Sequence, residues 1–134
     1  MTGREYVQKH IVTVEDEPAI VDLLSYVLDA PQVLLTTCTD GAEGLAAIRD
    51  QVPDLVIMDL MLPVLNGWQV YDALREDEAT RNLPVIILSV AGDESERREA
   101  FRGSEVDFFM NKPFDPRALR RIVQEILDIK IDAW

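Results

Sequence analysis

Five short apolar runs divide this chain, and stretches with helical spacing separate them. Strands of a parallel sheet are continuously apolar when both faces of the sheet are covered, and the connection between two such strands is usually a helix. The alternation therefore predicts an α/β fold, a parallel sheet with helices on both faces. The five predicted strands are Ile11–Val14, Val33–Thr37, Leu55–Met58, Val85–Leu88 and Val106–Met110.

The first, third and fourth runs are the most continuously apolar and should therefore lie at the centre of the sheet. We predict a flavodoxin-like, doubly wound sheet with the strand order 2-1-3-4-5, which places these three runs in the middle. Five helices complete the predicted fold. They are expected at residues 18–30, 41–48, 68–74, 94–101 and 116–127.

The composition suits one globular domain, with 48% hydrophobic and 28% charged residues among 134. We expect the domain at 10–128, between a polar lead-in at 1–9 and a tail at 129–134. A net charge of −12 argues against direct nucleic-acid binding, which uses Lys and Arg to neutralise phosphates. No apolar run approaches the length of a transmembrane helix, and the single Cys38 cannot form an internal disulfide. These features predict a cytoplasmic protein that does not contact a membrane.

Polar side chains stand at the carboxyl ends of four of the predicted strands. Glu15 and Asp16 follow the first strand, Asp59 the third, Ser89 the fourth and Lys112 the fifth. In open parallel sheets, ligands bind beyond the carboxyl ends of the strands, at the point where the strand order reverses. The predicted order puts this point between the first and third strands, so the sequence places these side chains around one crevice.

Three carboxylates in one crevice repel one another, and a divalent cation relieves that repulsion. Oxygen-only ligands favour Mg²⁺, and the ion together with the Lys112 ammonium would make the set neutral. A metal ion and an ammonium beside a carboxylate suit phosphoryl transfer to that carboxylate. They neutralise the phosphoryl oxygens while Asp59 attacks in line. The Ser89 hydroxyl could donate a hydrogen bond to one of these oxygens.

At this point the chain resembles a receiver domain of a two-component response regulator, of the chemotaxis-receiver type. Four motifs carry the resemblance, in the family's order and spacing, over residues 10 to 128. They are Val14-Glu15-Asp16-Glu17-Pro18, Met58-Asp59-Leu60-Met61-Leu62-Pro63 with Asn66-Gly67, Leu88-Ser89, and Asn111-Lys112-Pro113-Phe114.

The resemblance implies a role for each matched residue. Asp59 would be the phospho-acceptor, and Lys112 would pair with the phosphoryl group. Asp16 would be a direct Mg²⁺ ligand, with the backbone carbonyl of Met61 as a further ligand. Glu15 would act largely through metal-bound water.

The resemblance also implies a signalling function. The donor would be a histidine kinase or a histidine phosphotransfer protein, and the phosphorelay step would depend on magnesium. The chain would catalyse only its own phosphorylation and dephosphorylation and would not be a turnover enzyme. Ser89 and Phe109 would be a switch pair that changes the face of the fourth helix, fifth strand and fifth helix. That face, at 94–128, would control an unknown partner or output domain.

Some positions depart from the family pattern. Glu105 and Val64 stand where the family often has Gly, and Val90 stands where a smaller residue is common. Phe109 lacks the Tyr hydroxyl often found at its position. These departures concern loop geometry and the rate of dephosphorylation, because no catalytic group is lost. The family often has a cis bond before a proline matching Pro113.

Three other functions are weighed against this one. Haloacid dehalogenase-type phosphatases resemble this arrangement but have an acidic residue two positions after the nucleophile, where this chain has Met61. A flavodoxin-like FMN binder would need a phosphate-binding loop where the acidic Glu15-Asp16-Glu17 stands. A degenerate receiver used only for interaction would not need the complete acidic set and Lys112.

Overall fold

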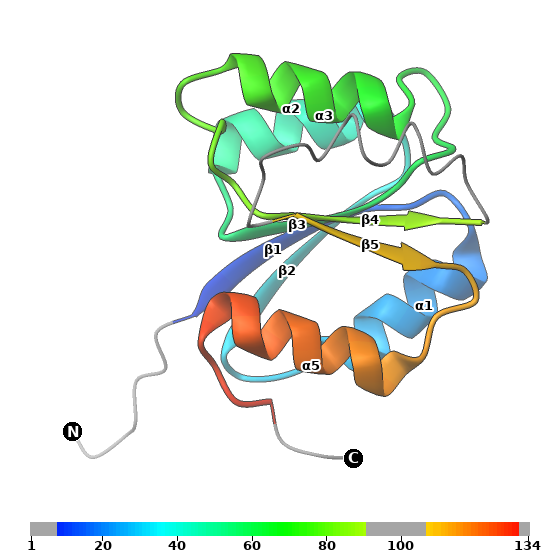
Figure 1. Cartoon of the computed structure of the whole chain (residues 1–134), viewed down its shortest axis with the longest axis vertical. Helices are drawn as coiled ribbons and strands as arrows, with labels where there is room; N and C mark the ends of the chain where they lie inside the picture. Colours follow the sequence, from blue (N-terminus) through cyan, green and yellow to red (C-terminus); the bar gives the residue numbers. More distant parts are fainter. Residues whose placement is uncertain (1–7, 91–106, 132–134) are drawn as a thin grey trace.

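The computed structural model describes residues 8–90 and 107–131, and these residues form a five-stranded parallel sheet in the order β2-β1-β3-β4-β5 (Figure 1). Both the parallel direction and the predicted order are confirmed. The strands are β1 (Lys9–Val14), β2 (Val33–Cys38), β3 (Leu55–Asp59), β4 (Val85–Ser89) and β5 (Phe108–Asn111).

Burial follows the predicted order. Every residue of β3 and β4 is buried, as are the last four residues of β1, whereas the edge strands β2 and β5 are partly exposed. A strand covered on both faces gains free energy by burying apolar side chains on both of them, so its sequence is mostly apolar. The three most continuously apolar runs are therefore the three central strands.

Four helices lie within the described residues, where the sequence predicts five helices for the whole chain. They are α1 (Pro18–Val27), α2 (Gly41–Gln51), α3 (Gly67–Glu76) and α5 (Pro116–Leu127). The helix predicted at 94–101 lies outside the described residues. Figure 1 shows α2 and α3 on one face of the sheet and α1 and α5 on the other. No helix in the described ranges is both long and apolar enough to cross a membrane.

Side-chain caps explain where most of these helices begin. The Asp40 carboxylate accepts a hydrogen bond from the Glu43 amide at α2, and the Asp115 carboxylate accepts one from the Arg117 amide at α5. At α3, Asn66 and Gln69 form a reciprocal capping box. Glu17 precedes α1, but its side chain makes no capping hydrogen bond. Pro18 starts α1 instead, because its fixed φ suits the first helical turn.

Each face of the sheet buries its own apolar cluster. One cluster joins the sheet to α1 and α5, and the other joins it to α2 and α3. The first cluster also includes Ile131, which is 5% exposed, so packing continues beyond residue 128. In the second, Gly44 of α2 lies so near the sheet that an added Cβ would meet Val14 at 2.6 Å. This contact shows how closely α2 approaches β1.

A buried polar network joins α3 to the start of β4 and of β5. Asp107 accepts hydrogen bonds from the Tyr71 hydroxyl at 2.7 Å, from Arg75 Nη2 at 2.6 Å and from the Val85 amide at 3.0 Å. Its side chain is fully buried. Burial, followed by the hydrogen bond to Asp107, raises the pKa of Tyr71 to about 12. We call Tyr71, Arg75, Val85 and Asp107 the Asp107 network.

We expect the stability of the fold to depend on Cys38 at alkaline pH. Burial, reinforced by the nearby charge of Glu43, raises the pKa of this thiol from 9.0 to about 11. Between these values the unfolded chain loses the proton while the folded chain keeps it, so stability falls as pH rises. The loss should reach up to about 2 kcal/mol. Urea unfolding at pH 8 and pH 10.5 measures it, and Cys38→Ala should show a smaller loss. Equal losses in both proteins would contradict the assignment.

Candidate functional site

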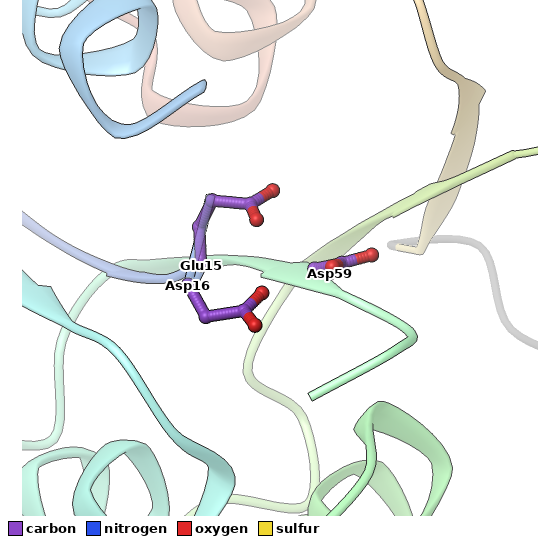
Figure 2. A group of neighbouring side chains, drawn as sticks. All are labelled: Glu15, Asp16 and Asp59. Atoms are coloured by element: carbon purple, nitrogen blue, oxygen red, sulfur yellow. The ribbon is translucent and has the colours of Figure 1, made fainter. Parts of the chain in front are cut away.

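Three carboxylates meet at the carboxyl ends of β1 and β3. Glu15 and Asp16 follow β1 directly, and Asp59 is the last residue of β3. Figure 2 shows the three side chains gathered at these two strand ends, and one carboxylate oxygen from each lies within 4.8 Å of the others. Glu15 and Asp59 are buried, whereas Asp16 is exposed. The crevice predicted at the reversal of strand order therefore holds the predicted acidic cluster.

Lys112 brings a positive charge into this cluster from the loop after β5. Its Nζ lies 2.7 Å from Glu15 Oε1, 3.4 Å from Asp59 Oδ2 and 3.7 Å from Glu17 Oε2. The amide of Lys112 donates to the Ser89 carbonyl at 2.8 Å, which joins the loop to the end of β4. The Lys112–Pro113 peptide bond is cis. The ammonium thus contacts both buried carboxylates of the site.

Burial and neighbouring charges shift the pKa values of Glu15 and Lys112. Burial raises the pKa of Glu15 and the charge of Asp59 adds to this, although Lys112 and the Glu17 amide oppose it. Burial alone would lower the pKa of Lys112, but Glu15 and Asp59 outweigh it, so this pKa lies above its ordinary value. The ammonium therefore stays charged at neutral pH.

Short-range backbone contacts hold Asp59 in place. The Met61 amide donates to Asp59 Oδ1 at 3.3 Å, and the Gly67 amide donates to the Leu60 carbonyl at 2.8 Å. An added Cβ at Gly67 would lie 2.7 Å from the Asp59 carbonyl oxygen and 2.8 Å from the Leu60 Cα. Only glycine permits this close approach, so α3 begins directly against the turn that carries Asp59.

A pocket of ≈ 430 Å³ opens onto the acidic cluster. Its floor holds Asp59 and Lys112, while Met61 and Val90 stand at its edge with 71% and 59% of their surface exposed. The other lining residues are Asp16, Glu17 and Pro18. A small anionic group could therefore reach Asp59 from outside and meet the ammonium beside it.

The two residues of the predicted switch pair do not line this pocket. The Ser89 side chain is buried, and its hydroxyl donates to the Val90 carbonyl at 2.7 Å. The sequence predicts that this hydroxyl donates to a phosphoryl oxygen. The Ser89 side chain would have to rotate away from the Val90 carbonyl to do so. Phe109 is half-buried and packs against Trp68, with ring centroids 5.8 Å apart.

The sequence analysis missed the part that two residues play in the site. Glu17 was named only within the acidic motif after the first strand, and Val90 was noted for its size but not as part of the pocket edge. Glu17 could have been found from its place two residues after Glu15, because a short turn after a strand can return both side chains to one cation.

Val64 has a left-handed backbone with φ 71°, in the loop between Asp59 and α3. Such a φ is strained for a β-branched residue and easy for glycine. The glycine that the family often has here thus has a physical reason, and this chain carries the strain in a loop that adjoins the site.

The donor set fits a hard divalent cation. All three acidic residues offer oxygen, and their closeness creates repulsion that a cation would relieve. Both Glu15 oxygens are already engaged: the Glu17 amide donates to Oε2 at 3.0 Å, and Lys112 makes a close charge contact to Oε1. The exposed Asp16 and the pocket-lining Asp59 are more open to an ion.

Comparison with known proteins identifies one family. The family described as the response regulator receiver domain matches residues 11–124. Among curated relatives, the DNA-binding dual master transcriptional regulator RpaA of Synechocystis is 35% identical over 117 residues, which are 87% of this chain and 48% of that protein. An uncharacterized 14.6 kDa protein of Leptolyngbya boryana is 30% identical, over 88% of this chain and 89% of its own length. This chain spans about half the length of the curated transcriptional regulators that it matches.

A solved structure shares the fold of this chain. It is the receiver domain of the sensor histidine kinase PA1611 from Pseudomonas aeruginosa, with a magnesium ion coordinated in its active-site cleft. The two chains align with a TM-score of 0.77 and 27% identity, over 91% of this chain and 99% of the other.

Proposed function

Because this chain belongs to the response regulator receiver family, we propose that Asp59 accepts a phosphoryl group from a histidine kinase or a histidine phosphotransfer protein. One observation carries the proposal. Lys112 Nζ lies 3.4 Å from Asp59 Oδ2, inside a three-carboxylate cluster that a pocket connects to the surface. A buried carboxylate beside an ammonium is placed to attack an incoming phosphoryl group whose charge the ammonium offsets.

Phosphoryl transfer to Asp59 forms one bond and breaks one. An Asp59 oxygen attacks phosphorus in line and forms an O–P bond, while the P–N bond to the donor histidine breaks. The leaving imidazole keeps the bonding electron pair and takes a proton from solvent. Lys112 exchanges part of its contact with Asp59 for a phosphoryl oxygen, so the chain neither gains nor loses a buried cation. The edge formed by Met61 and Val90 is where the donor would enter.

We propose that Mg²⁺ is held by Asp16, Asp59 and the backbone carbonyl of Met61, with Glu15 acting through metal-bound water. Engagement of both Glu15 oxygens supports its indirect role. The ion would offset negative charge on the phosphoryl oxygens. The chain's own residues do the remaining work: they hold the nucleophile, place the ammonium and shape the entrance.

Replacing Asp16 with Asn should weaken Mg²⁺ binding at least several-fold, because the exposed acidic ligand loses its charge. Isothermal calorimetry measures the dissociation constant. Asp50→Asn is the matched control, since Asp50 is an exposed acidic residue near the end of α2. Equal affinities for Asp16→Asn and the parent would place the ion elsewhere.

We propose that the chain acts on its own Asp59 and is not a turnover enzyme. The residue two positions after the nucleophile is Met61, whose side chain is mostly exposed and cannot act as a general acid. Steady hydrolysis of a small phosphate ester would favour the phosphatase alternative.

Intact-mass measurement tests phosphoryl uptake directly. The parent, incubated with acetyl phosphate and Mg²⁺, should gain one labile phosphoryl group. Chelating the metal should suppress the gain. A parent that stays unmodified under all these conditions, with a small donor and with a phosphorylated kinase, would overturn the proposed function.

We further propose that Ser89 and Phe109 transmit the modification to the face formed by residues 94–128, of which 94–106 lie outside the described residues. The Ser89 hydroxyl would exchange the Val90 carbonyl for a phosphoryl oxygen as its hydrogen-bond acceptor. The Phe109 ring would move as the segment after Ser89 shifts toward Asp59. The phosphoryl group then shifts populations through its differential contacts.

Ser89→Ala should therefore still take up the phosphoryl group but switch poorly. Amide NMR spectra with and without beryllofluoride, a stable phosphoryl mimic, measure the response of residues 107–128. The parent should show shifts there and Ser89→Ala should show much smaller ones. Shifts confined to the surroundings of Asp59 in the parent would rule this mechanism out.

The partners and setting are proposals of the same kind. The output partner or domain is unidentified. We propose that this domain controls it without itself binding nucleic acid or a membrane. We also propose that the protein acts in the cytoplasm. We propose 10–128 as the receiver domain, with 1–9 and 129–134 flanking it. Lys9 joins it through pairing in β1, and Ile131 through packing.

A further inference from the structure

We infer that Trp68 of α3 is a positioning residue for Phe109, and that it sets how readily the switch leaves its resting arrangement. The inference rests on the proposed function, because it concerns the ring that the phosphoryl group would move. It adds α3 to the elements that control the switch.

Trp68, Tyr71 and Phe109 form an aromatic cluster on the side of the sheet that α2 and α3 cover. The Trp68 and Phe109 rings lie 5.8 Å apart at 45°, and the Trp68 and Tyr71 rings lie 5.8 Å apart edge to face. Both separations fall in the range of attractive aromatic pairs. Trp68 and Phe109 are both half-buried against the same apolar cluster. Phe109 thus has a large, specific surface on which to rest.

The helix that carries Trp68 is anchored at its first turn. Asn66 and Gln69 cap each other, and the Gly67 amide donates to the Leu60 carbonyl one residue after the phospho-acceptor. The glycine contact described above leaves no room for α3 to approach Asp59 further. Trp68 therefore follows directly on a segment whose position depends on Asp59.

The same helix is anchored to β5 further along. Residues 68, 71 and 75 share one face of α3, because they are spaced by three and four positions. Tyr71 and Arg75 on that face bind the buried Asp107, two residues before Phe109. The backbone entering β5 is therefore held to α3. These contacts fix the position of Trp68 relative to the backbone of Phe109.

Phe109 packs on Trp68 in one state of the switch. In that state the Ser89 hydroxyl donates to the Val90 carbonyl. When Phe109 leaves, the contact with Trp68 is lost while the anchors of α3 remain. Trp68 therefore stabilises the resting state relative to the switched one. A smaller side chain at this position should raise the population of the switched state before any phosphoryl group is added.

Trp68→Leu tests the inference through two readouts. In the untreated variant, the Phe109 ring resonances should move toward their positions in beryllofluoride-treated parent. The beryllofluoride concentration at half-response should fall by about three-fold or more, because less of the binding free energy is used to shift the population toward the switched state. Trp68→Phe, which keeps an aromatic partner, should restore both readouts toward the parent. Tyr26→Leu, at an exposed aromatic residue of α1, is the matched control and should change neither.

The outcomes separate this inference from the proposed function. If the parent takes up a phosphoryl group but Trp68→Leu leaves the Phe109 resonances and the half-response unchanged, the inference alone is overturned. Movement away from the treated positions would also overturn it. If the parent takes up no phosphoryl group, the proposed function fails and the inference fails with it. Trp68→Met carries the same test if the Leu variant loses cooperative thermal unfolding.

Discussion

Asp59→Asn should abolish phosphoryl uptake completely. A carboxamide is a poor nucleophile, and it also removes the negative charge that Lys112 Nζ faces at 3.4 Å. The fold should survive, because the substitution takes one charge out of a crowded acidic cluster and relieves its repulsion with Glu15. Intact-mass analysis after incubation with acetyl phosphate and Mg²⁺ should therefore show no adduct, while the melting temperature stays at or above that of the parent.

Asp72→Asn is the matched control, because Asp72 is an exposed acidic residue on α3 that does not line the pocket. It should be modified to the same extent as the parent. Labelling of Asp59→Asn at the parental level would show that another residue is the acceptor.

Asp107→Ala should cost about 3 to 5 kcal/mol of folding free energy, a large part of the stability of a domain this size. The substitution leaves the Arg75 guanidinium, the Tyr71 hydroxyl and the Val85 amide without the acceptor that they share. The Arg75 side chain is only 22% exposed, so water replaces the lost contact poorly. Urea unfolding followed by circular dichroism measures the change.

Arg49→Ala provides the comparison for a surface ion pair. Arg49 Nε lies 4.0 Å from Asp77 Oδ2, with both side chains well exposed, so its removal should cost under about 1 kcal/mol. A loss of similar size in Asp107→Ala would mean that the Asp107 network adds little to stability.

Periodicity and strand-end chemistry made much of this protein predictable. The run Leu55–Met58 is apolar at every position, so the sequence alone predicts its place at the centre of the sheet. Glu15, Asp16, Asp59 and Lys112 could be grouped because parallel strands bring their carboxyl ends to one edge. Both predictions depend only on the repeating geometry of strands and on the handedness of their connections, which any sequence with this pattern obeys.

Other features depend on side-chain directions, which local patterns do not specify. Nothing in the spacing of Ser89 indicates that its hydroxyl donates to the Val90 carbonyl, because a serine rotamer depends on which acceptors surround it. Glu17 occupies a capping position, yet its carboxylate lies near Lys112 because that ammonium arrives from β5, far along the chain.

The sequence by itself determined the sheet, its order and the edge at which the acidic residues meet. The tertiary structure alone decided that Trp68 packs on Phe109 and that Asp107 joins α3 to β5. These contacts link residues 32 to 41 positions apart on different elements. Their formation depends on how α3 rests on the sheet, and that is set by the packing of the whole core rather than by any local pattern.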